Sequence, residues 1–129
     1  MIVDGILNSF APAGLTEYTI PDSVTTIGDY AFSNCSSLTS VTIGDRVTTI
    51  GYATFAFCEN LKTVYCKAIN PPTTIVNNNG YWYGFAKKDE SGNICNIDCT
   101  IYVPAESVEA YKSAEGWSEY ADGIVGYDF

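Results

Sequence analysis

Apolar residues recur along this chain in a pattern with a fixed 23-residue period. Residues 15–37 align without gaps on residues 38–60, and 12 of the 23 positions are identical. A third copy begins at residue 61 with LKTVYC and then departs from the pattern. Self-similarity at a fixed period is the sequence signature of a repeat architecture, so the repeat organises the interpretation of the whole chain.

Each unit contains two extended pieces and a turn. The stretch L-x-x-V-x-I alternates apolar and polar residues, which predicts short strands at 15–20, 38–43 and 61–66. The stretch V-T-T-I-G predicts a second extended piece after a turn that contains Asp22 or Asp45. The F-x-x-C end of the unit is expected to form a short helical or 3₁₀ turn that carries Phe32 or Phe55 inward.

One such unit cannot bury its apolar edge alone, whereas stacked copies close a core and pair their strands laterally. A 23-residue period lies within the range of roughly 20–29 residues that leucine-rich repeats occupy. We therefore predict an α/β solenoid, a leucine-rich repeat protein with 23-residue units. It would carry a parallel β-sheet on one face, short helical turns and a C-terminal helical cap.

The repeat divides the chain into three parts. Residues 1–14 are expected to be a degenerate half-repeat or N-terminal cap, because Ile2, Val3, Gly5 and Phe10 resemble the second half of a unit with one residue inserted. Gly5, Gly28 and Gly51 also follow one another at the 23-residue spacing of the repeat. Residues 15–66 are expected to hold the leucine-rich repeats, at 15–37 and 38–60, with the strand of a third at 61–66.

Residues 67–129 are expected to form a C-terminal capping region, with an insertion at 73–99 and a helix at about 105–115. Pro104 is expected to open that helix and Gly116 to end it. Ala105, Val108 and Tyr111 fall on one helical face, which we expect to pack on the end of the solenoid.

Composition and charge narrow the function classes. The 129 residues carry a net charge of −9 and include no histidine. Histidine-dependent catalysis and histidine metal sites are therefore excluded, and we expect a non-enzymatic protein without cofactor or metal. The acidic balance disfavours nucleic-acid binding. No apolar run approaches the roughly 20 residues of a membrane-spanning helix.

Five cysteines stand at 35, 58, 66, 95 and 99. An odd number leaves at least one thiol free, and no C-x-x-C pair suggests zinc. We expect most of them to be small buried apolar side chains. If a disulfide exists, Cys66 with Cys95 or Cys99 is the pairing to test first.

Two surfaces are candidates for binding a protein or glycan partner. Residues between the inward positions of each strand face solvent on the sheet, and the candidates there are Thr42, Thr63, Tyr65 and Lys67. The alternative is that threonine and serine simply favour strands. In the insertion, the candidates are Tyr81, Trp82 and Tyr83, whose rings are suited to stacking on a ligand. The alternative is that these aromatic residues cap the open end of the solenoid.

The repeats resemble a known family. IPDSVTTIGDYAFSNCSSL and VTTIGYATFAFCENL are similar to the BspA-like leucine-rich repeats of surface proteins from Bacteroides-type bacteria. The tail, VYCKAINPP and the segment from TIYVPAESVEAY to the end, is similar to C-terminal ends common in that group. The resemblance covers about residues 15–72 and 100–129.

The resemblance implies a secreted or cell-surface interaction module with a role in adhesion, although no signal peptide is visible in residues 1–10. The alternative is a structural cap or spacer of a longer solenoid without a ligand of its own. For the oligomeric state we expect a monomer or a weak dimer formed edge to edge through the open sheet edge.

Overall fold

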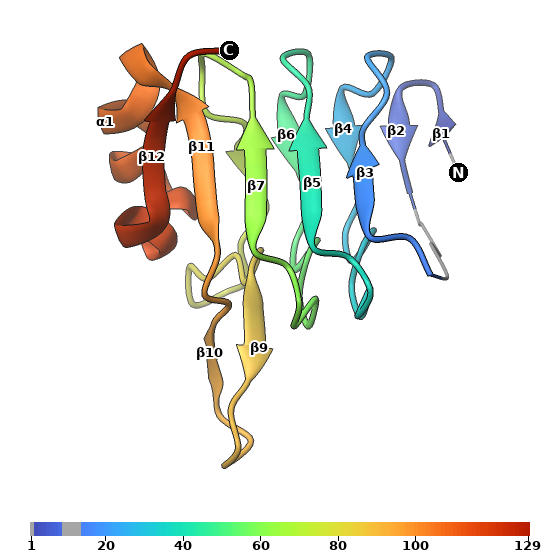
Figure 1. Cartoon of the computed structure of the whole chain (residues 1–129), viewed down its shortest axis with the longest axis vertical. Helices are drawn as coiled ribbons and strands as arrows, with labels where there is room; N and C mark the ends of the chain where they lie inside the picture. The colour runs from blue at the N-terminus through green and yellow to red at the C-terminus, as the bar shows by residue number, and fades with distance from the viewer. Residues whose placement is uncertain (1, 9–13) are drawn as a thin grey trace.

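The computed structural model describes residues 2–8 and 14–129, so Phe10 of the expected half-repeat lies outside the described residues. Five parallel strands form a front sheet in the order β12-β11-β7-β5-β3 (Figure 1). Their bounds are β3 Glu17–Thr19, β5 Ser40–Ile43, β7 Thr63–Cys66, β11 Thr100–Pro104 and β12 Ile124–Tyr127. The first three are the L-x-x-V-x-I strands expected from the repeat.

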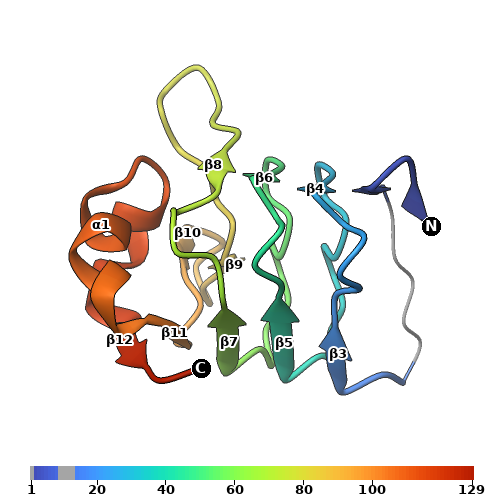
Figure 2. The same ribbon diagram turned by 90° about the horizontal axis from the view of Figure 1, so that it is seen from above.

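A second sheet lies behind the first, on the opposite side of the coils (Figure 2). Its order is β1-β2-β4-β6-β8, and the V-T-T-I pieces of the repeat form β4 and β6. The bounds are β1 Ile2–Val3, β2 Ile6–Leu7, β4 Thr26–Ile27, β6 Thr49–Ile50 and β8 Thr73–Thr74. Three successive coils, which start at residues 15, 38 and 61, therefore each contribute one short strand to each sheet, and the apolar side chains between the sheets form the core.

The N-terminal segment joins this second sheet, but its strand β2 pairs with β4 in a register that differs from the one predicted by the 23-residue spacing of Gly5 and Gly28. Leu7 pairs with Ile27 and is buried, so it occupies the column that Ile27 and Ile50 continue. Gly5 lies two residues before that column, with a φ of 79°, and its carbonyl accepts the N–H group of Thr25 at 2.8 Å. The 23-residue separation of Gly5 and Gly28 is therefore not a structural equivalence.

The third side of each coil is a row of turns, which we call the turn row, at residues 29–35, 52–58 and 82–85. The N–H group of Phe32 donates to the carbonyl of Thr54 at 2.9 Å, and Phe55 donates in the same way to Gly84 at 2.9 Å. Left-handed backbone recurs here, with positive φ at Tyr30, Asn34, Ala53, Phe57 and Tyr83. These turns differ from the expected helical turns, because left-handed residues interrupt a right-handed helix.

The turn row shows that the third coil continues beyond residue 66, where the sequence pattern places its end. The Phe55 ring stacks between Phe32 and Phe85, with centroids 5.0 and 5.2 Å away. Phe85 is therefore the third member of a phenylalanine column that begins with Phe32 and Phe55. The repeat is hidden in the sequence because extra residues after β8 form a loop, closed by a 2.8 Å hydrogen bond from the Asn77 N–H group to the Tyr81 carbonyl (Figure 2).

The C-terminal region adds a hairpin, β9 Ala86–Lys88 with β10 Ile94–Asn96, and then β11. The helix expected at 105–115 is a 3₁₀ turn, η1 Ala105–Ser107, followed by α1 Val108–Ser113, and a second 3₁₀ segment, η2 Trp117–Gly123, leads into β12. As expected, Tyr111 is buried against the solenoid end. Ala105 is exposed instead, because η1 and α1 are not one continuous helix.

Candidate functional site

Four aromatic side chains gather on the solvent face of the front sheet, at its C-terminal end. This front-sheet aromatic patch consists of Tyr65 on β7, Tyr102 on β11, Tyr127 on β12 and Phe129. The Tyr65 and Tyr102 rings stack with their centroids 5.2 Å apart, and Tyr127 packs edge to face with both, at 5.6 and 5.4 Å. Phe129 completes the patch at 4.8 Å from Tyr127. Large contiguous aromatic surface outside the core marks an interaction site more often than isolated exposed residues do.

Strand register explains why these rings meet. Tyr65 pairs with Tyr102, while their neighbours Val64 and Ile101 pair with each other and are buried. Alternation along a strand therefore places both tyrosines on the outer face. The similarity of TIYV at 100–103 to TVYC at 63–66 is a sequence signal for this pairing, and sequence reasoning missed it.

The candidates predicted for the sheet face lie beside this patch. Thr42 is the register partner of Tyr65 on the opposite side from Tyr102. Thr63 is half-buried and pairs with Thr100. Lys67 is exposed directly after β7. The front sheet thus brings together Thr42, Tyr65 and an aromatic surface from the tail, and that tail surface was not predicted.

Trp82 does not present its ring to a ligand. Its side chain is fully buried, and its indole Nε1 donates to the carbonyl of Gly51 at 2.8 Å. The ring packs on Trp117, with centroids 5.0 Å apart. The prediction of Trp82 as a ligand-binding residue is therefore wrong, because the indole fills the interior between the third coil and the cap.

Tyr81 and Tyr83 form a second aromatic surface. Their rings stack at 5.4 Å, and Tyr83 also meets Tyr52 edge to face at 6.2 Å. Tyr52 in turn contacts Tyr30 at 5.6 Å. These side chains belong to the turn row and its preceding loop, so the structure does not join them with the candidates on the front sheet.

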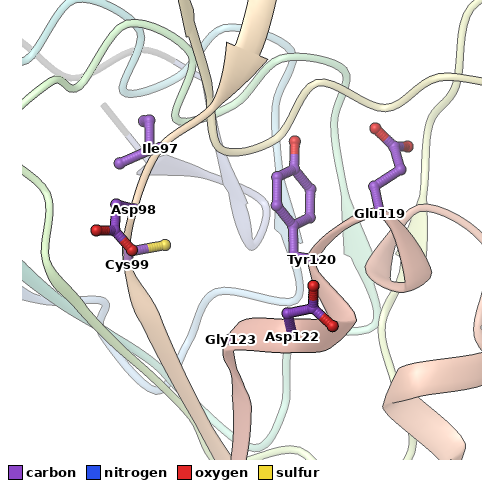
Figure 3. A pocket seen from close by; sticks show the side chains of 7 residues that line it. All are labelled: Ile97, Asp98, Cys99, Glu119, Tyr120, Asp122 and Gly123. Carbon is purple, nitrogen blue, oxygen red and sulfur yellow. The ribbon is translucent and has the colours of Figure 1, made fainter.

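An acidic pocket of about 280 Å³ lies between the segment that precedes β11 and η2 (Figure 3). Asp98 and Cys99 line one side, and residues of η2, including Glu119 and Asp122, line the other. The Glu119 Oε2 atom accepts the backbone N–H group of Trp82 at 3.0 Å. Glu119 therefore has a structural role in joining η2 to the third coil.

Other classes of site are not evident in the described part of the chain. Within residues 2–8 and 14–129, no cysteine and carboxylate side chains are grouped closely enough to hold a metal ion. Over the same ranges, no helix is both long and apolar enough to cross a bilayer.

No disulfide joins any of the five cysteines, which all lie within the described residues, and Cys35, Cys58 and Cys66 are buried as expected. The suggested pairing of Cys66 with Cys95 or Cys99 is absent. Burial raises the pKa of Cys66 to about 11, although a hydrogen bond with the Tyr111 hydroxyl at 3.3 Å opposes the rise. Burial also raises the pKa of Cys58 to about 12.

These raised pKa values predict how stability depends on pH. An unfolded thiol titrates near pH 8.5, so the neutral buried thiols stabilise the fold fully below that pH and lose the contribution as pH rises through about 11–12. We expect urea midpoints that fall from about pH 9 upward. Part of that fall should disappear in Cys66→Ala. An unchanged pH slope in this variant would contradict the role of the Cys66 thiol.

Stacked 23-residue units with a parallel sheet on one face are the architecture of a leucine-rich repeat protein. The family model described as "BspA type Leucine rich repeat region (6 copies)" matches residues 7–81, so the chain belongs to this family. The search of curated proteins gives no match. Leucine-rich repeats of this kind are generally non-enzymatic modules for protein interaction, and the family is typically extracellular or surface-associated.

Proposed function

We propose that this protein is a secreted or cell-surface adhesion module that binds a protein partner through the front-sheet aromatic patch. The observation that carries the proposal is the contiguity of Tyr65, Tyr102, Tyr127 and Phe129 on the face of a rigid parallel sheet. Repeat proteins offer such faces as extended binding surfaces.

The chemistry of the patch favours a protein over a glycan. Stacking on a sugar requires an open ring face, whereas Tyr65 and Tyr102 cover each other and both pack edge to face with Tyr127. Tyrosine edges and hydroxyl groups combine apolar area with hydrogen bonding, which is why tyrosine is enriched among residues that dominate protein interfaces. The exposed Tyr127 and Phe129, at 43% and 47%, provide the apolar area that a partner would bury.

Binding to a panel of purified extracellular proteins and to a glycan array tests the proposal. We expect at least one protein to bind, with Tyr102→Ala weakening that binding by about 2 kcal/mol, or roughly 30-fold in Kd. Tyr102 is the variant of choice because its ring contacts both Tyr65 and Tyr127, with centroids 5.2 and 5.4 Å away.

Thr19→Ala is the matched control, since Thr19 is an exposed residue on β3, at the other edge of the same sheet. It should change the affinity by less than about 0.5 kcal/mol. Binding to glycans alone, or equal effects of the two substitutions, would refute the proposed site.

A further inference from the structure

One position of the turn row holds tyrosine in two coils and alanine in the coil between them. The Tyr30 N–H group donates to the Tyr52 carbonyl at 2.9 Å, and the Ala53 N–H group donates to the Trp82 carbonyl at 3.0 Å. Tyr30, Ala53 and Tyr83 are therefore equivalent residues of successive coils. They share the left-handed backbone, with φ of 57°, 52° and 53°. The column thus reads Tyr–Ala–Tyr and lacks its middle ring.

A hollow of about 170 Å³ lies over the missing ring. Tyrosine rings form its walls and alanines form its floor, and two further apolar side chains complete the lining: Tyr30, Tyr52, Tyr83, Ala53, Ala56, Ala86, Phe57 and Ile94. The Tyr52 ring meets Tyr30 and Tyr83 edge to face, which closes one side of the hollow. The three alanines are buried, so the floor is apolar and formed by small side chains.

We propose that this hollow, here called the tyrosine hollow, binds one aromatic side chain of a partner polypeptide. The adjacent phenylalanine column shows the required fit, because Phe55 fills the equivalent gap with its centroid 5.0 Å from Phe32 and 5.2 Å from Phe85. An apolar cavity of about 150 Å³ is known to accommodate benzene, so the volume matches a single aromatic ring.

A polypeptide is the occupant that the surroundings favour. The tyrosine hollow is smaller than the roughly 300–1,000 Å³ of sites for drug-sized ligands, and it suits one side chain. Phe57 also lines a neighbouring hollow of about 480 Å³, together with Asn34, Ser36, Glu59 and Lys88. These polar groups supply donors and acceptors for the peptide groups that flank an anchoring ring. The tyrosine hollow is separate from the front-sheet aromatic patch, and the proposal for the hollow does not depend on the function proposed for the patch.

Methyl NMR titrations of the full chain test the proposal. The probes are N-acetyl-tyrosinamide and N-acetyl-phenylalaninamide, with N-acetyl-leucinamide as the aliphatic comparison. We expect saturable upfield ring-current shifts of the Ala53 and Ala56 methyl groups with the aromatic probes, in the millimolar range appropriate to one side chain. The leucine probe should bind at least about tenfold more weakly, because it has no ring to pack against the tyrosine rings that line the hollow.

Two variants change the tyrosine hollow in opposite ways. Ala53→Tyr supplies the missing ring from the chain itself, and the backbone accepts it because Tyr30 and Tyr83 adopt the same φ. Tyr83→Ala removes one wall. Each is expected to weaken the aromatic probe at least about tenfold. Ile69→Ala is the matched control, since Ile69 is as exposed as Tyr30, at 55%, and does not line the hollow.

Three results would overturn the proposal. One is equal binding of the leucine and aromatic probes, and another is undiminished binding by both Ala53→Tyr and Tyr83→Ala. The third is a shift of the Ala53 methyl group that grows with protein concentration in the absence of probe, because a second copy of the chain would then fill the hollow.

Discussion

Replacing Trp82 with alanine is expected to lower the free energy of unfolding by about 3–5 kcal/mol. The indole is fully buried and packs on Trp117, Phe85 and Tyr120, with centroids 5.0, 5.4 and 6.0 Å away. Its Nε1 also donates to the Gly51 carbonyl in the second coil. The substitution would therefore create a cavity where the second coil, the third coil and η2 meet.

Urea unfolding followed by circular dichroism measures this loss. Tyr81→Ala is the control, because Tyr81 is the adjacent aromatic residue but is 48% exposed. It is expected to cost less than about 1 kcal/mol. If the two variants unfold at the same urea concentration, the indole of Trp82 does not hold the cap to the coils.

Gly51→Ala is expected to be the second severe substitution, with a loss of at least about 3 kcal/mol or failure to fold. A Cβ atom at residue 51 would lie 2.5 Å from the carbonyl carbon of Gly28 and 2.6 Å from Asp29 Oδ1. Relief requires moving the backbone of the preceding coil, because overpacking of this kind cannot be relaxed by side-chain rotation alone. The clash would also disturb the 2.7 Å hydrogen bond from the Gly51 N–H group to the Ile27 carbonyl.

Gly44→Ala provides the comparison within the same coil. A Cβ atom there meets nothing closer than Asp22 Oδ1 at 3.9 Å, and its φ is not in the left-handed region. We expect Gly44→Ala to change the free energy of unfolding, measured by thermal unfolding, by no more than about 1 kcal/mol in either direction. Equal destabilisation by both substitutions would show that the coils are not packed as closely at Gly51 as the structure places them.

The repeat in the sequence was sufficient to predict the short strands and the pairing of equivalent residues between successive coils. Val41 and Val64 occupy the same position of successive repeats and are register partners, as the alignment predicts. Phe85 could not be aligned in this way, because the repeat spacing after Phe55 falls on Asn78. The Phe85 ring occupies the next position of the stacked core although the loop residues shift it out of the 23-residue spacing. An alignment by spacing alone therefore misses the third coil.

The binding surface was less predictable because its residues come from separate parts of the chain. Thr42 and Tyr65 lie in the repeats, and their outward orientation is a consequence of strand alternation. Tyr102 and Tyr127 reach the same surface only because β11 and β12 extend the front sheet. Trp82 was instead predicted on the binding surface although it lies in the core. The sequence around an aromatic residue that follows a turn does not indicate whether its side chain faces solvent or the core.

The contact surface is tested most directly by tyrosine iodination of the free protein and of its complex with a protein identified in the binding panel. Tyr102 and Tyr127 should be modified in the free protein and protected in the complex. Tyr111 and Tyr120, which are buried, should remain unmodified in both states and report that the fold is intact. Full reactivity of Tyr102 and Tyr127 in the complex would contradict binding through the front-sheet aromatic patch.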